Sequence, residues 1–535
     1  MSQDVICGEL IALLKRAHTL GTIGELLGWD EQVNLPPGAA EQRAAQHAVL
    51  AETQHAAMSD ARIGELLTYL ESGDGPPGRP AESARPALSA SRAPGLNPGS
   101  ARPAVTPCLE ADRAAIVAHA RHEYDRATKL PAEFVREKAA QGSRGYHAWA
   151  RAKATDDFAG YAPVLEKNME FARREAAYLG RGDAAYDYML DKHDPGLTAA
   201  AVDRLFGELK RDLVPLMQRI VASPAAGRAR EVAGRLRGFP VEGQRVFLRE
   251  VTERLGFDYT RGRIDVSLHP FCSGTGSDVR MTTRYKADQP LDALFGSIHE
   301  TGHGLYEQGL PPEHLGTALG IHAGMAVHES QSRLWENQVA RSRSFWRHFE
   351  PRWRELFPVQ TADVTSEELY LAVNAVEPTL IRVDADEVTY NLHIVLRFEM
   401  EKKLFAGELA VRDLPAAWRA ASRELIGLEP TNDREGVLQD VHWSDGAFGY
   451  FPSYCLGNMI AAQLWARVRV VRPAVEDDFA RGDFTWLLGW LRENIHAQGR
   501  RFSALELVRR MTGEELSPRY LVEYLRERYG GLYLA

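Results

Sequence analysis

The spacing of apolar residues places the strongest constraint on the fold, because they recur at intervals of three and four along most of the 535-residue chain. Clear examples are residues 8–29, 161–179 and 201–221. Residues three or four apart share one face of an α-helix, and charged residues occupy the opposite faces here. We therefore expect a mainly α-helical protein whose amphipathic helices pack on a large core.

Two short segments depart from this pattern, since they alternate in polarity and are rich in β-branched residues. They are residues 263–271 and 278–285, and the sequence CSGTGS separates them at 272–277. Glycines among small polar residues are typical of a turn. The sequence predicts one hairpin or small sheet within the helical protein.

Residues 72–108 differ in composition from the rest of the chain. Pro, Gly, Ser, Ala and Arg dominate there, and large apolar residues are almost lacking. Such a segment cannot bury enough surface to offset the chain entropy lost on folding. We expect a disordered insertion that joins two helices as a surface loop; a regulatory or partner-binding segment is the alternative.

Charge and composition argue against two classes of protein. A net charge of -9 and a pI near 6.1 disfavour a general binder of nucleic acid or membrane surfaces, since both need a concentrated positive field. We find no apolar run long enough to span a bilayer, and residues 1–20 indicate an amphipathic helix rather than a signal peptide. The expectation is a soluble, cytoplasmic protein. Its scattered cysteines, without CxxC spacing, are expected to be reduced thiols: Cys7, Cys108, Cys272 and Cys455.

The sequence HETGH at 299–303 carries the chemistry. On a helix, His299 and His303 project from one face, so both imidazoles can reach a single metal ion. Glu300 follows the first histidine, where its carboxylate can act as a base on a metal-bound water. Gly302 and Gly304 each cost about 1 kcal/mol against alanine inside a helix. They suggest a close backbone approach by substrate or a neighbouring helix; a kink or tight packing is the alternative.

A catalytic zinc site needs a third protein ligand and an open position. The helical run at 323–338 offers two adjacent candidates, His328 and Glu329. Spacing alone does not decide between them, and a solvated helix glutamate remains a third possibility. The residues by themselves leave this choice open.

Six blocks in order make this chain resemble the carboxypeptidase Taq family of zinc metallocarboxypeptidases, from about residue 5 to the C-terminus. They are HPF (269–271), DVRMTTRY (278–285), HETGH (299–303), HESQSRLWEN (328–337), IRVDADEVTYNLHIVLRFE (381–399) and GVLQDVHWSDGAFGYFPSYCLGN (436–458). Only the insertion at 72–108 lacks a counterpart. The chain is therefore expected to be one catalytic domain, 1–535, interrupted by this insertion.

The resemblance implies a ligand set, an activity and an assembly. It assigns zinc to His299, His303 and Glu329, with cobalt as a possible substitute, and it makes Glu300 the base. It implies release of single residues from peptide C-termini with broad specificity, sparing C-terminal proline. It also implies a homodimer, and a helical fold whose long groove is shared with neurolysin-like and angiotensin-converting-enzyme-like peptidases.

Recognition of a free C-terminal carboxylate calls for a fixed cation, and the fork of arginine suits it better than lysine. Arg382 is the first candidate, supported by the match to the IRxxAD block, and Arg280 is the second. The alternative for either arginine is a structural salt bridge with one of three neighbouring aspartates. These are Asp278, Asp384 and Asp386.

A developing oxyanion needs further hydrogen-bond donors in a dry site. Suitable donors occur in the matching blocks, although each is equally explained as a packing side chain. They are His269, His442, Tyr450 and Tyr454. Asp440 or Asp386 is expected to orient a zinc-bound imidazole.

Two other functions compete with the carboxypeptidase. One is a related zinc oligopeptidase that cuts internally or releases dipeptides. The other is a non-enzymatic, metal-stabilised scaffold or peptide-binding protein. An intact Glu300 argues against the latter, because a purely structural metal site has no use for a base.

Overall fold

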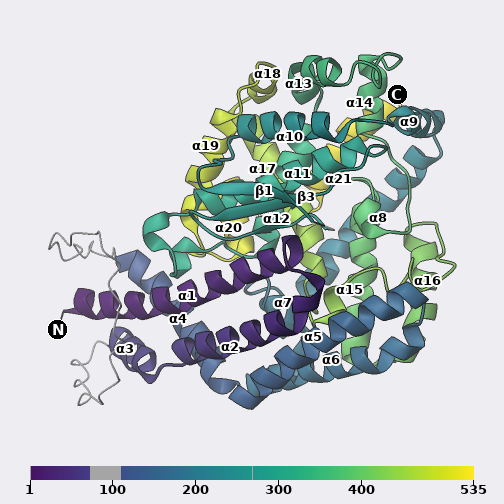
Figure 1. Cartoon of the computed structure of the whole chain (residues 1–535). Helices are drawn as coiled ribbons and strands as arrows, with labels where there is room; N and C mark the ends of the chain where they lie inside the picture. The colour runs from purple at the N-terminus through teal and green to yellow at the C-terminus, as the bar shows by residue number, and fades with distance from the viewer. Residues whose placement is uncertain (1, 73–109, 268) are drawn as a thin grey trace.

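The computed structural model describes residues 2–72, 110–267 and 269–535, and helices dominate them, as predicted (Figure 1). Apart from Ser72, which ends a helix, the predicted insertion lies outside the described residues. The α-helices described before the strands are α1 (Gln3–Val33), α2 (Ala40–Met58), α3 (Ala61–Ser72), α4 (Glu110–Lys129), α5 (Ala132–Thr155), α6 (Phe158–Tyr178), α7 (Ala185–Asp191), α8 (Ala199–Val221), α9 (Pro224–Arg235) and α10 (Val241–Leu255).

The remaining helices follow the strands. They are α11 (Pro290–Gly309), α12 (Met325–Arg333), α13 (Arg343–Leu356), α14 (Ser366–Val373), α15 (Tyr390–Ala406), α16 (Leu414–Leu425), α17 (Phe451–Val471), α18 (Val475–Ala480), α19 (Thr485–Asn494), α20 (Ala504–Thr512) and α21 (Arg519–Tyr533). A π-helical segment, η5 (Leu334–Ala340), continues directly from α12. Such segments widen a helix by one residue per turn and often occur at functional sites.

The small sheet has three strands, β1 (Gly262–Val266), β2 (Cys272–Ser273) and β3 (Val279–Thr283), in the order β1-β3-β2. A small sheet was predicted and is confirmed, but a hairpin between residues 263–271 and 278–285 is wrong. β1 runs parallel to β3, with Arg263 opposite Arg280, whereas β2 is antiparallel to β3. The tight turn comes only after β2, at Gly274 with φ of 86°, so β1 pairs with the other edge of β3.

Within the described part of the chain, two hydrophobic clusters make up the core. The larger joins residues from α5 through α21, including the inward face of β3. The smaller lies among α1, α3 and α4, where Leu10, Leu66 and Ile116 are buried. In Figure 1 the purple helix α1 lies below the sheet, and α2 packs on the side of α1 that faces away from the sheet.

Helices α11, α12 and α17 pack together at the centre, with α11 also against β3. A Cβ added to Gly302 of α11 would come within 2.5 Å of the Cα of Ser332 in α12. The predicted close approach of a neighbouring helix is therefore confirmed at Gly302. Gly304 instead faces the ring of Phe257, 2.7 Å from such a Cβ.

No helix among the described residues is both long and apolar enough to cross a membrane. Cys272 and Cys455 carry free thiols and Cys7 is buried, whereas Cys108 lies outside the described part of the chain.

Candidate metal centre

Three side chains from two helices converge at the centre of the molecule. The Nε2 atoms of His299 and His303, one turn apart on α11, lie 3.2 Å from each other. The Oε2 atom of Glu329, on α12, lies 3.6 Å from the first and 3.4 Å from the second. Ligands about 2.0–2.1 Å from a tetrahedral zinc lie about 3.3 Å apart. The three donors therefore fit a small divalent ion, and they are the set with metal-site spacing among the described residues.

The second nitrogen of His299 has a partner that determines its tautomer. Its Nδ1 lies 2.9 Å from Oε2 of Glu336, in the π-helical segment η5. Burial alone would raise the pKa of Glu336, but Arg333 and His299 hold it at about 2. An ionised carboxylate can only accept, so Nδ1 donates and Nε2 presents its lone pair to the centre.

Two side chains, Glu307 and His328, determine the tautomer of His303 in the same way. Oε1 of Glu307 lies 2.8 Å from Nε2 of His328, whose Nδ1 lies 2.5 Å from Nδ1 of His303. Since the carboxylate accepts from His328, a neutral His328 accepts in turn from His303. This leaves Nε2 of His303 free to bind a metal. His328, the alternative third ligand, thus faces the other side of this imidazole.

Glu329 is held as a buried anion. Arg333 donates to its Oε1 at 2.7 Å, and the hydroxyl of Ser332 donates to Oε2 at 3.1 Å. Burial acts to raise the pKa of Glu329, but Arg333, His299 and His303 hold it well below its usual range. The side chain also lies against Gly457 of α17, where an added Cβ would be 2.5 Å from the Glu329 Cγ. Its own helix and the neighbouring α17 therefore define its position.

Glu300 is almost fully buried beside this cluster, with 7% of its surface exposed. Burial raises the pKa of Glu300 to about 7, although the neighbouring His299 acts to lower it. A carboxyl group whose pKa lies near neutrality can both accept and return a proton. Its surroundings thus suit proton transfer.

Arg382 shares one carboxylate with a second buried arginine. Its Nε donates to Oδ1 of Asp440 at 2.9 Å, while Nε of Arg397 donates to Oδ2 at 2.7 Å. The pair of guanidinium groups and the single carboxylate leave one surplus positive charge. Arg382 also donates to the hydroxyl of Tyr390 at 2.9 Å, and Arg333 lies 4.2 Å from the centre of that ring. Tyr390 therefore lies between Arg382 and Arg333, the arginine that holds Glu329.

Three of the predicted oxyanion donors lie around Arg382. Nε2 of His442 lies 3.0 Å from the hydroxyl of Tyr454, and the ring of Tyr450 lies 5.2 Å from that of Tyr454. The guanidinium of Arg382 lies 4.9 Å from the centre of the Tyr454 ring. Burial lowers the pKa of His442 to about 3, so it is neutral at physiological pH.

Of the two remaining predicted contacts, Arg280 lies away from this cluster, whereas the ring of His269 is close enough to feel the charges of Arg382 and Asp440. Arg280 donates through Nε to Asp278 at 2.8 Å, the salt bridge offered as its alternative, and lies 4.3 Å from the ring centre of Trp29. His269 is exposed, and its backbone carbonyl accepts hydrogen bonds from Ser267 and Thr282. Partial burial and nearby cations, Arg382 among them, lower the pKa of its ring.

The prediction that Asp440 or Asp386 orients a zinc-bound imidazole is wrong. Asp440 binds the two arginines, and Asp386 accepts from the backbone N–H groups of Val388 and Thr389 at 2.8 and 3.0 Å. Glu336 and His328 contact the imidazoles instead. Helical spacing could have indicated the two carboxylates behind these contacts, because Glu336 lies seven residues after Glu329, and Glu307, the partner of His328, lies four after His303.

Comparisons with known proteins define the class as a metallopeptidase. The model of the carboxypeptidase Taq (M32) metallopeptidase family matches residues 9–529. Thermostable carboxypeptidase 1 of Thermus thermophilus is 41% identical, and carboxypeptidase 1 of Bacillus subtilis 36%; the matches cover 100% and 98% of both chains, respectively. The crystal structure of the M32 carboxypeptidase from Deinococcus radiodurans superposes with a TM-score of 0.87 at 41% identity, covering 99% of this chain and 100% of that one.

The chain belongs to the carboxypeptidase Taq (M32) metallopeptidase family. It is a metallocarboxypeptidase, a hydrolase of peptides, and the small sheet and helical fold match the M32 structures. Membership implies a divalent metal ion, which the three converging donors fit.

Proposed function

We propose that this enzyme is zinc-dependent and releases single amino acids from peptide C-termini. One zinc ion per chain would be held by His299, His303 and Glu329, with cobalt as a possible substitute. The observation that carries the proposal is the triangle of donor atoms, with edges of 3.2, 3.4 and 3.6 Å. Two imidazoles and one carboxylate form a ligand set common in catalytic zinc sites.

Glu300 acts as the general base in this proposal. When bound, zinc supplies an acidified water and polarises the scissile carbonyl. Glu300 takes the proton as the water attacks and passes it to the leaving amine. Its raised pKa, near 7, supports both transfers.

Arg382 is proposed to bind the C-terminal carboxylate of the peptide. The support is electrostatic, because Asp440 neutralises only one of the two buried guanidinium groups. A substrate carboxylate would balance the second charge in a site that water reaches poorly, where ion pairs are stronger. His442, Tyr450 and Tyr454 are proposed to donate to the oxyanion or to the peptide. Arg280 and His269 are second-choice contacts.

Family membership supports the finer expectations as proposals. These are broad specificity that spares C-terminal proline, a single catalytic domain with a groove like that of neurolysin-like and angiotensin-converting-enzyme-like peptidases, a homodimer and a cytoplasmic location. The net charge of -9 supports the absence of nucleic-acid partners.

Mass spectrometry of the products from one peptide and its C-terminally amidated twin tests the proposal. With zinc, stepwise loss of single residues from the free peptide alone is expected, and a chelator should abolish it. Internal cuts or dipeptide release would instead indicate an oligopeptidase. Glu300→Gln should retain zinc but lose about 10²- to 10⁴-fold in kcat. Near-normal turnover with zinc in place would overturn the assignment of Glu300.

A further inference from the structure

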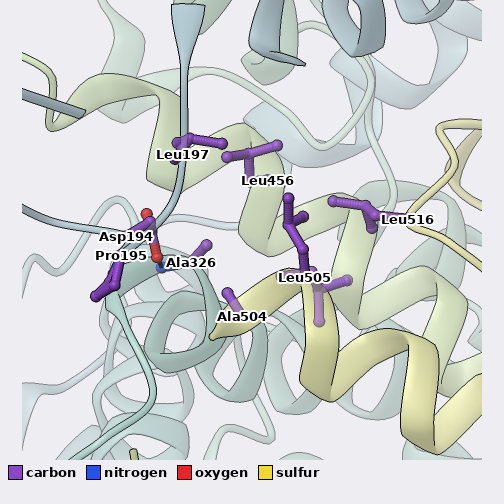
Figure 2. Close-up of a pocket in the computed structure, with 9 residues that line it drawn as sticks. Asp194, Pro195, Leu197, Ala326, Leu456, Ala504, Leu505 and Leu516 are labelled. Carbon is purple, nitrogen blue, oxygen red and sulfur yellow. Dashed lines mark hydrogen bonds between the residues drawn. The ribbon is translucent and has the colours of Figure 1, made fainter. Parts of the chain in front are cut away.

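A buried aspartate between α7 and α8 joins the beginnings of two helices. Asp194 has 3% of its surface exposed. Its Oδ1 accepts from the backbone N–H of Ala326 at 2.8 Å, in the first turn of α12. Its Oδ2 accepts from the hydroxyl of Ser453 at 2.6 Å, in the first turn of α17. Figure 2 shows Asp194 close to Ala326.

Helix α12 depends on this segment for its N-terminal cap. The first four N–H groups of any helix lack partners within it, and a carboxylate beside them is favoured by the helix dipole. The N-cap residue of α12 is Gly324, which has no side chain to accept a hydrogen bond. The carbonyl of His193 accepts from the N–H of Met325 at 3.0 Å, and Asp194 accepts from the next N–H.

Position 324 has no room for a capping side chain of its own. Gly324 has a φ of 143°, and a Cβ there would lie 2.6 Å from Oδ1 of Asp194. A capping serine or aspartate at position 324 would therefore collide with Asp194. The cap that α12 uses comes from about 130 residues earlier in the chain, as the separation between Asp194 and Ala326 shows.

One turn beyond these contacts, the two helices meet at the metal centre. Glu329 follows Ala326 by three residues, Gly457 follows Ser453 by four, and Glu329 lies directly against Gly457. Asp194 therefore ties the two helices together one turn before the point where α17 supports the Glu329 side chain. We propose that Asp194 is a positioning residue for the metal centre, which sets the position of α12 against α17 and thereby that of the Glu329 carboxylate.

A small cavity beside Asp194 gives the first turn of α12 space to move into if the contact between Asp194 and Ala326 is lost. Its lining includes Leu197, Ala326, Leu456 and Leu505 (Figure 2), and it measures about 10 Å³, room for one water at most. Without the carboxylate, the first turn of α12 can relax into this space. Ligand distances in metal sites hold within about 0.2 Å, so a small shift of Glu329 weakens binding.

The inference rests on the proposed ligand set, and zinc affinity is its primary readout. Zinc binding is measured by competition with a chromogenic chelator, together with kcat, KM and the thermal midpoint. We expect Asp194→Ala to weaken zinc binding about 10- to 100-fold and to lower kcat more than it raises KM. Asp194→Asn should stay within about threefold of the wild type, because its amide accepts from Ala326 and donates to Ser453.

Two variants keep the test decisive. Asp478→Ala removes another buried aspartate, which lies on α18 and is held by Arg472 and Arg481. This variant should lower the thermal midpoint but leave zinc affinity unchanged. Ser453→Ala removes only one of the two hydrogen bonds of Asp194. It should weaken zinc binding by about three- to tenfold even if Asp194→Ala fails to fold.

The possible failures are distinguishable. If Glu329→Gln leaves zinc affinity unchanged, the proposed ligand set is wrong. If Glu329→Gln weakens binding while Asp194→Ala and Ser453→Ala lower only the thermal midpoint, then Asp194 is merely structural and the inference fails.

Discussion

Glu336 accepts a hydrogen bond from Nδ1 of His299 over 2.9 Å. Arg333 and Arg341 donate to the same carboxylate at 3.2 and 3.3 Å, so its own position is held from two further sides. The orientation of the His299 ring thus depends on a residue 37 positions later in the chain.

Loss of this carboxylate should loosen the ring. We expect Glu336→Ala to weaken zinc binding about 10- to 100-fold, because the His299 tautomer and orientation are no longer imposed. Competition with a chelator measures this. Glu350→Ala on α13 is the matched control, since it removes a half-buried carboxylate bound to Arg354. Equal zinc affinities in the two variants would contradict the positioning of His299 by Glu336.

Gly457 is expected to be intolerant of even one methyl group. Its alanine variant would place a Cβ 2.5 Å from Cγ of Glu329, so the carboxylate must move. Gly457→Ala should therefore lower both zinc affinity and kcat by at least about tenfold. Gly207→Ala on α8 is the control, because nothing lies within 4 Å of its added Cβ. It should be stabilising by about 0.5–1 kcal/mol in urea unfolding, with normal activity. Unchanged activity in Gly457→Ala would show that Glu329 does not need this contact.

Arg382 is expected to determine recognition of the free C-terminus. Arg382→Lys keeps the charge but loses the fork that contacts Asp440 and Tyr390. KM for a free peptide should rise about 10- to 100-fold, which corresponds to the free energy of losing one or two charged hydrogen bonds. Zinc content should stay normal. Arg419→Lys, at a salt bridge with Asp433, is the control and should retain wild-type kinetics. An unchanged KM in Arg382→Lys, with a raised KM in Arg280→Ala, would move the anchor to Arg280.

The surroundings of Glu175 predict how the free energy of unfolding depends on pH. Its buried carboxylate binds Lys138, lies 3.2 Å from Lys192 and 3.4 Å from Arg126, and accepts from Tyr188 at 2.8 Å. Burial acts to raise the pKa of Glu175, but Lys192 and Lys138 hold it well below its ordinary value of 4.5. The cluster therefore contributes fully above pH 4.5 and loses its contribution as the pH falls toward the folded-state pKa.

Glu175→Gln should accordingly lower the free energy of unfolding by about 3–5 kcal/mol at pH 7, since three cations lose their counterion. The difference from wild type should shrink below pH 4.5. Urea unfolding at several pH values measures both effects. Glu170→Gln on the same helix breaks an exposed pair with Lys167 and should cost at most about 1 kcal/mol. A difference that stays constant from pH 7 to pH 3 would contradict the assignment.

Local patterns predicted much of the architecture. The three- and four-residue spacing of apolar side chains identified α1, α6 and α8, because helix periodicity depends only on nearby residues. Strand pairing was harder to predict. β-branched residues located β1 and β3, yet their parallel arrangement depends on the path of the connection between them.

The sequence by itself determined the helical class, the family and the sharing of one helix face by His299 and His303, since each follows from local spacing or from motifs in order. Residue spacing left Glu329 and His328 open as third ligands and the family resemblance favoured Glu329; the tertiary structure brings the Glu329 carboxylate beside the Nε2 atoms of those histidines. It also decided which carboxylate orients His299 and which residue caps α12. These contacts join atoms on separate helices, such as Asp194 and Ala326, and local periodicity carries no information about how two helices face each other.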